Sequence, residues 1–189
     1  MKKATIIAAL LVSSAATFAQ TWNIDKAHSR IGFGVTHLAV AELGGTFNNV
    51  DAKFTSSKPD FTDAVIELSA DVNSINTDNE QRDGHLKSPD FFDAAKYPAI
   101  TFKSTSFKKV SDKKYKLSGD LTMHGVTKPV VLDVVFNGTS TNPMSKKTIA
   151  GFKITGSFKR SDFGVGASMP AAIVSDEVAL NANTEFAKD

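Results

Sequence analysis

The sequence alternates apolar and polar residues over most of its length, and this period of two is the feature that most constrains the fold. In the stretch AVIELSADV, Ile66, Leu68 and Ala70 share one face, whereas Glu67 and Ser69 share the other. Successive side chains of a β-strand point to opposite faces, so such a stretch predicts a strand with one buried face. We therefore expect an all-β protein.

Eight such segments recur along the chain, and each is about ten residues long, which is long for a strand. They read SRIGFGVTHL, GGTFNNVDAKF, AVIELSADV, AITFKSTSF, YKLSGDLTM, VVLDVVFN, AGFKITGSFK and EVALNANTE. Turn-forming stretches separate them, among them Gly44-Gly45, SSKPD and STNPMSKK. An open sheet of this size has two exposed edges, and closure into a barrel removes them. The sequence predicts one domain, an eight-stranded antiparallel barrel that is either filled by side chains or hollow enough for a ligand.

The segment after the third strand interrupts the alternation. Thr77 is followed by Glu80, a spacing typical of a capping box, and DNEQRDGHLK then predicts a short helix. The Ser-Pro pair at Ser88 predicts a second turn through Phe91 and Phe92. We expect this helical insert between two strands to cover one end of the barrel, with at least one phenylalanine packed into its mouth. An ordinary connection that plugs a core is the alternative.

Residues 1–19 have the pattern of a secretory signal peptide, with two lysines, an apolar stretch and the small residues of TFA before Gln20. A membrane anchor is the alternative, but a spanning helix needs about 20 apolar residues. We therefore expect cleavage near Ala19/Gln20, a mature domain over residues 20–189, and a periplasmic or secreted protein. No later apolar run has the length of a transmembrane segment.

The charges of the mature chain balance. The whole chain has 22 Lys and Arg against 20 Asp and Glu, and loss of Lys2 and Lys3 makes the two counts equal. Broad electrostatic attraction to nucleic acid is therefore not expected. The stretch FKSTSFKKVSDKKYK mixes lysines with aromatics, but its alternation indicates a solvated rim around a hairpin rather than a nucleic-acid platform. Cysteine is absent, so stability must come from the core.

Four blocks of the sequence resemble the YceI-like family: WNIDKAHSRIGFGVTHL, RDGHLKSPDFFDAAKYPAITFKSTSF, GDLTMHGVTKPVVLDV and RSDFGV. They follow one another in the expected order over nearly all of the mature chain. The resemblance implies an extended lipocalin-like barrel with a long apolar cavity for a polyisoprenoid, a quinone or a fatty acyl chain. It also implies a carrier or storage role without catalysis, and it is compatible with a homodimer.

The chain has fourteen phenylalanines, which supply apolar area without a polar group that needs a partner. Such residues suit both a dry core and a hydrocarbon site, and the resemblance favours the cavity. The expected wall residues are Phe33, Val35, Phe47, Phe102, Leu121, Met123, Phe152, Ile154 and Phe158. Phe91, Phe92 and Met169 are expected at the lid. The expected polar contacts are His37, Arg82, His85, Arg160, Ser161 and Asp162.

No metal site, cofactor or catalytic group is expected apart from the bound lipid. The four histidines are far apart in sequence without ligand spacing, and there is no G-x-S-x-G elbow. Two other functions remain open. One is an enzyme acting on an isoprenoid lipid or quinone in the same cavity, which would need a convergent acid–base pair. The other is a filled barrel used for protein contacts.

Overall fold

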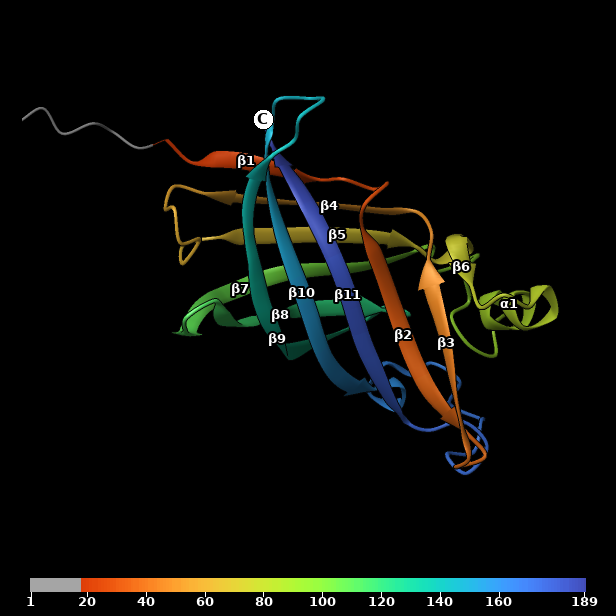
Figure 1. The fold of residues 1–189 in the computed structure, drawn as a ribbon. Coiled ribbons are helices and arrows are strands. Elements are labelled where there is room, and N and C mark those ends of the chain that lie inside the picture. Colours follow the sequence, from red (N-terminus) through yellow and green to blue (C-terminus); the bar gives the residue numbers. More distant parts are fainter. Residues whose placement is uncertain (1–17) are drawn as a thin grey trace, which may run out of the picture.

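The computed structural model describes residues 18–189, so the expected signal peptide lies almost wholly outside the described residues. Eleven strands, one α-helix and two short 3-10 helices (η) make up this part (Figure 1). Their bounds are β1 Gln20–Ile24, β2 Arg30–His37, β3 Ala41–Phe47, β4 Val50–Ser56, β5 Val65–Asp71, η1 Val72–Ser74, β6 Ile75–Asn76, α1 Glu80–Lys87, β7 Ala99–Ser111, β8 Lys114–Met123, β9 Val126–Thr141, β10 Thr148–Lys159, η2 Arg160–Phe163 and β11 Glu177–Lys188.

The strands close into a barrel. Antiparallel pairing runs in the order β1-β4-β5-β7-β8-β9-β10-β11, and β1 then pairs with β11 to complete a ring of eight. The predicted closed eight-stranded antiparallel barrel is therefore confirmed. β2, β3 and β6 extend this ring at one end, because β2 pairs with β11 and β3, and β3 pairs with β6.

Three of the eight wall strands are bent, and each bend divides one strand into two. β1 and β2 both run along β11, with Ile24 opposite Phe186 and Ile31 opposite Ala182. In the same way β3 continues into β4 and β5 continues into β6. The stretch GGTFNNVDAKF, expected as one strand, is therefore two strands separated by a bend at residues 48–49.

The expected turn at Gly44-Gly45 is wrong, because both glycines lie inside β3. The chain reverses earlier, between His37 and Ala41. The glycines have a packing role: a Cβ on Gly45 would come within 2.5 Å of the Phe33 ring. The sheet therefore needs a residue without a side chain at this position.

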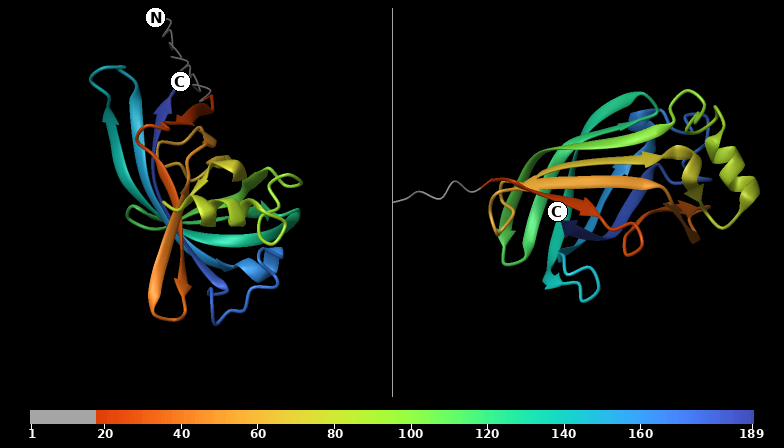
Figure 2. Two further views of the ribbon diagram at one scale, coloured as in Figure 1. Left: turned by 90° about the vertical axis from the view of Figure 1, so that its right-hand side faces the viewer. Right: turned by 90° about the horizontal axis from the view of Figure 1, so that it is seen from above.

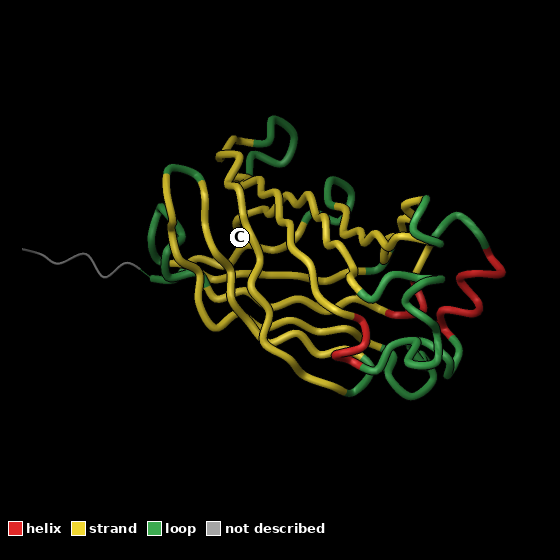
Figure 3. Tube along the Cα trace, turned by 90° about the horizontal axis from the view of Figure 1, so that it is seen from below, coloured by secondary structure: helices red, strands yellow, loops and turns green. Residues whose placement is uncertain are grey.

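The up-and-down order places alternate connections at opposite ends of the barrel. The β2–β3 hairpin, the insert of residues 77–98, the β8–β9 turn and the loop of residues 160–176 surround one end, here called the mouth (Figure 2, left). The helical turns all lie toward that end (Figure 3). The β4–β5 loop of residues 57–64 lies at the other end (Figure 1).

The insert contains the predicted helix, but its cap is not the predicted one. Asn79 is the N-cap of α1, and its side chain accepts a hydrogen bond of 2.9 Å from the backbone N–H of Arg82. Thr77 lies too early for this geometry and is instead buried, bonded to Asp83 and Arg82. The expected capping box of Thr77 and Glu80 is therefore wrong. After the helix the chain forms the predicted turn through Phe91 and Phe92.

Candidate functional site

A cavity of about 650 Å³ occupies the interior of the barrel. The inward rows of the alternating strands form its wall, and nearly all of them are apolar. Sixteen of the eighteen expected wall, lid and polar contacts line it: Phe33, Val35, His37, Phe47, Arg82, His85, Phe91, Phe92, Phe102, Leu121, Met123, Phe152, Ile154, Phe158, Arg160 and Met169. The interior is therefore hollow, although the role of these residues in binding stays a prediction.

The candidate Asp162 does not line the cavity. It lies on η2, where about three residues make a turn, so Arg160 and Phe163 share the buried face. Asp162 and Ser161 face solvent, and the Ser161 hydroxyl donates to the Asp176 carboxylate at 2.8 Å. Neither side chain is placed to contact a molecule in the cavity.

The cavity has further lining residues outside that candidate set, and alternation could have found most of them. Leu117, Leu132 and Val134 lie in the same inward rows as the chosen residues. Ile173 and Val174 come from the loop before β11, which has no periodic pattern. Only the fold reveals that this loop reaches the cavity.

Aromatic rings close the end of the cavity away from α1. Trp22 stacks on Phe54 at 5.4 Å between ring centroids, and Phe61 meets Trp22 edge-on at the same distance. The cluster continues through Phe136, Phe152 and Phe186 on neighbouring strands (5.3 and 6.1 Å). Edge-to-face and offset ring pairs pack densely. The cluster therefore forms an apolar floor.

The β4–β5 loop holds Phe61 in this floor. The residue has a φ of +58°, a left-handed conformation that is unfavourable for a bulky side chain, yet it is 4% exposed. Asp63 anchors the loop by accepting hydrogen bonds from Ser56 and Ser57. Burial of Asp63 acts to raise its pKa, but these hydrogen bonds prevail and hold the pKa well below the usual range. The Tyr115 hydroxyl donates to the carbonyl of Asp60 at 2.9 Å.

Aromatic residues of the insert cover part of the mouth. Phe92 meets Phe47 edge-on at 6.1 Å, and Phe47 in turn lies 5.7 Å from Phe33. Phe91 is buried, as expected for at least one of the two phenylalanines. Its ring approaches Gly166 so closely that a Cβ there would lie 2.7 Å away. The insert and the loop before β11 therefore pack against each other.

Arg160 lines the cavity but has no free donor. Its guanidinium donates to the carbonyl oxygens of Ser175, Val165, Gly166, Met169 and Val174. These bonds use all five N–H groups of an arginine. The buried side chain therefore fixes the loop of residues 160–176 around the mouth, and the expectation that it receives a ligand is not supported by its geometry.

Arg82, His37 and His85 are further nitrogen-bearing side chains that line the cavity near the mouth. Arg82 donates from Nε to the Thr77 hydroxyl at 2.8 Å and from Nη2 to the Thr77 carbonyl at 2.7 Å. Its Nη1 has no acceptor among residues 18–189. His37 and His85 also line the cavity, and His85 Nε2 lies 3.5 Å from a carboxylate oxygen of Asp90. Arg82 thus has donors that a polar group at the mouth could use.

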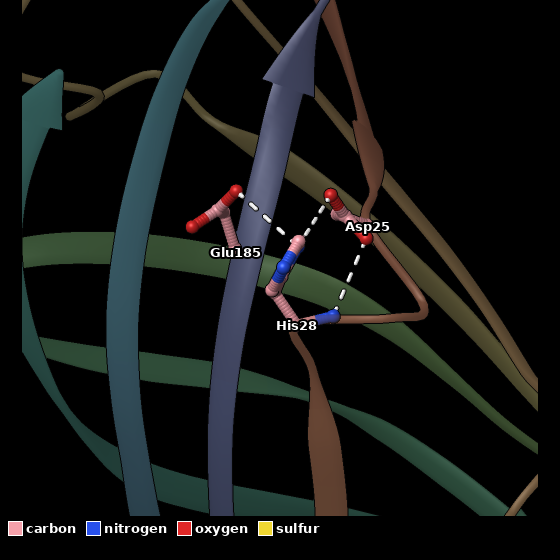
Figure 4. A group of neighbouring side chains, drawn as sticks. All are labelled: Asp25, His28 and Glu185. Carbon is pink, nitrogen blue, oxygen red and sulfur yellow. Dashed lines mark hydrogen bonds and ion pairs between the residues drawn. The ribbon is translucent and has the colours of Figure 1, made fainter. Parts of the chain in front are cut away.

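The fold brings one histidine beside two carboxylates outside the barrel, which spacing in the sequence did not indicate (Figure 4). His28 Nδ1 lies 2.9 Å from Asp25 and 4.0 Å from Glu185. The hydrogen bond to Asp25 raises the pKa of His28, and the same bond lowers the pKa of Asp25. A metal ion would have to displace this bond. His28 and Asp25 lie in the bend between β1 and β2, and their contacts with Glu185 connect this bend to β11.

Within the described part of the chain, no helix has the length and apolar character needed to cross a membrane. A profile of the YceI-like domain matches residues 22–186. Protein YceI of Escherichia coli O157:H7 is 36% identical over 190 aligned positions, which cover 98% of this chain and 97% of the relative. Protein YceI of Salmonella newport (strain SL254) is 35% identical and covers 95% and 93%.

Solved structures have the same fold. The Campylobacter jejuni YceI protein is 32% identical with a TM-score of 0.74, and the match covers 100% of this chain and 99% of that one. A polyisoprenoid binding domain from Saccharophagus degradans has a TM-score of 0.65 at 16% identity, covering 89% and 98%, which shows the fold alone. With a domain match across almost all of the described residues and relatives above 30% identity along the whole chain, the protein belongs to the YceI-like family.

Proposed function

We propose that the protein is exported and holds a long-chain amphiphilic lipid, a polyisoprenoid or a molecule of similar shape, inside its barrel. The observation that carries the proposal is the cavity of about 650 Å³ with an almost wholly apolar wall. At about 30 Å³ for a water-sized group, this space takes on the order of twenty methylene-sized groups. That capacity suits a hydrocarbon chain better than a compact polar metabolite.

The affinity would come from burial of the chain, at about 0.8 kcal/mol for each methylene group. Part of this gain is offset because a flexible chain loses conformational freedom when it is straightened. The aromatic floor around Phe61 fixes the far end of the chain. The polar headgroup would then stay at the mouth, where Arg82, His37 and His85 line the cavity.

Family membership points to a binding protein rather than an enzyme. The Saccharophagus degradans neighbour is described as a polyisoprenoid binding domain, which supports a hydrophobic ligand of that class here. A carrier or storage protein needs only a cavity and an opening, and both are present. The export part of the proposal depends on the signal-peptide pattern of residues 1–19.

The test is to produce the full chain in a Gram-negative host, recover it without detergent and measure its mass under native and denaturing conditions. The native mass should exceed the denatured mass by one lipid, and organic solvent should extract a molecule of that mass. Delipidated protein should take up an added polyprenol or long-chain fatty acid. A protein that neither carries nor takes up a lipid would contradict the proposal. N-terminal sequencing of the periplasmic fraction should begin at Gln20 if export occurs.

A further inference from the structure

Two loops without charge lie side by side at the mouth. One is the tip of the β2–β3 hairpin, HLAVA, and the other is the stretch FGVGASMPAAIVS of residues 163–175. The N–H of Leu38 donates to the carbonyl of Ile173 at 2.9 Å, and His37 pairs with Val174 as an isolated β-bridge. The hairpin and the loop before β11 also lie together in both views of Figure 2. They form one continuous edge of the opening.

This edge exposes large apolar side chains. Leu38 is 52% exposed, Val40 is 83% exposed and Ile173 is 40% exposed. We call these three residues the rim patch. Ile173 also lines the cavity, as do its neighbour Val174 and the adjoining His37. The apolar surface of the rim patch is therefore continuous with the cavity lining through Ile173 and Val174.

The hairpin tip holds its apolar residues in an unfavourable backbone conformation. Leu38 and Ala39 have φ angles of +49° and +57°. Three residues, Leu38 to Val40, connect the paired His37 and Ala41, and turn positions with positive φ are normally occupied by Gly, Asn or Asp. Leucine and alanine at these positions lower local stability, and about half of the Leu38 side chain stays exposed. Strained and exposed residues of this kind point to a function at the tip.

We propose that the rim patch inserts into the interfacial region of a lipid bilayer, so that a lipid passes between the membrane and the cavity without crossing water. This inference rests on the proposed function. Three side chains at the tips of two projecting loops are too few for a stable protein contact, which buries roughly 800 Å² on each partner. Uncharged apolar tips suit the boundary between headgroups and acyl chains, where exposed apolar groups leave water.

Two variants remove apolar surface from the patch without adding charge. Val40→Ser shortens the most exposed member, and Leu38→Asn also replaces a strained leucine by a residue that tolerates positive φ. Val110→Ser is the matched control, because Val110 is 63% exposed beside the β7–β8 turn at the opposite end of the barrel. None of these three side chains lines the cavity.

The assay is flotation of the full mature protein with vesicles of phosphatidylcholine, which carry no net charge. The wild type and Val110→Ser should float with the vesicles. Val40→Ser and Leu38→Asn should each lose roughly tenfold or more of their affinity for the vesicles. The melting temperature of Leu38→Asn should stay equal to that of the wild type or rise, which separates the effect from unfolding. Transfer of a fluorescent fatty acid from these vesicles should slow in the same two variants.

Several results would overturn the inference. The inference would fail if the wild-type protein took up lipid from solution but never floated with vesicles. That result would leave the proposed function intact. Another is equal binding by all four proteins. Dimerisation of the wild type that Val40→Ser abolishes would show that a second copy covers the patch instead. A protein that floats but never holds a lipid would refute the proposed function and leave membrane contact without its stated purpose.

Discussion

Substitution of Ala182 by phenylalanine tests whether the hollow interior is used. Ala182 lies midway along β11 between Ile154 and Ile31, is 3% exposed and lines the cavity. A phenylalanine ring at this position would occupy the space of about six methylene groups, which corresponds to about 5 kcal/mol of lost ligand burial. Since 1.4 kcal/mol is a factor of ten, the dissociation constant should rise by about three powers of ten.

The same substitution should leave the protein stable. A ring that fills an existing void gains burial, whereas a ring forced into a filled core costs about 1–3 kcal/mol. Ala182→Phe should therefore melt at the wild-type temperature or above it when both proteins are delipidated. The control is Ala179→Phe, because Ala179 lies on the outer face of the same strand and is exposed. It should leave lipid binding unchanged.

Native mass spectrometry and displacement of a fluorescent fatty acid measure the binding, and thermal unfolding measures the stability. If Ala182→Phe were strongly destabilised and still bound lipid as tightly as the wild type, the reasoning would fail in both parts. The space at β11 would then be needed for packing, and the ligand would lie elsewhere.

Three further predictions concern the loops and the bend. Arg160→Leu should lower the free energy of urea unfolding by about 3 kcal/mol or more, because several buried carbonyls lose their donors, and Arg160→Lys should lie between the two. Asp63→Asn should lower the melting temperature at neutral pH. Because the pKa of Asp63 is lowered in the folded protein, the ionised carboxylate stabilises the fold above a pH of about 4, and this stabilisation is lost as the pH falls further. The difference in melting temperature from the wild type should therefore shrink in acid. His28→Gln should be less stable than the wild type around pH 5–6, where His28 is protonated and Asp25 is ionised. Urea titrations should show that this difference in stability shrinks as the pH rises through the raised pKa of His28. A difference that is constant with pH would show that the charge of His28 has no part in it.

The wall of the barrel could be predicted from the sequence because alternation is a local property. Alternation with their sequence neighbours predicts that Leu121 and Phe152 face inward, and both line the cavity. The bend at Asn48 could not be predicted in this way, since it leaves the alternation of the flanking segments almost undisturbed. The cap at Asn79 could not be predicted from the Thr77–Glu80 spacing, because the tertiary contacts of Thr77 with Asp83 and Arg82 decide where the helix begins.

The two ends of the cavity depend on contacts between distant parts of the chain. Phe61 joins the floor from a loop with no periodic pattern, next to Trp22 and Phe54 on other strands. The five carbonyls around Arg160 are likewise brought together only by the folded loop. Whether opposite walls meet is a matter of distance across the barrel, which no pattern along the chain encodes.

The aromatic floor closes one end of the barrel, so it would fix how deep a bound molecule can go. If the proposed lipid enters at the mouth, it would stop against the ring of Phe61, and its number of carbons would set the position of its polar end. A short chain would draw that polar end below Arg82 into apolar surroundings, and a long one would leave hydrocarbon in water. Both misfits would cost free energy, so under the proposed function the depth of the barrel would favour chains of one length.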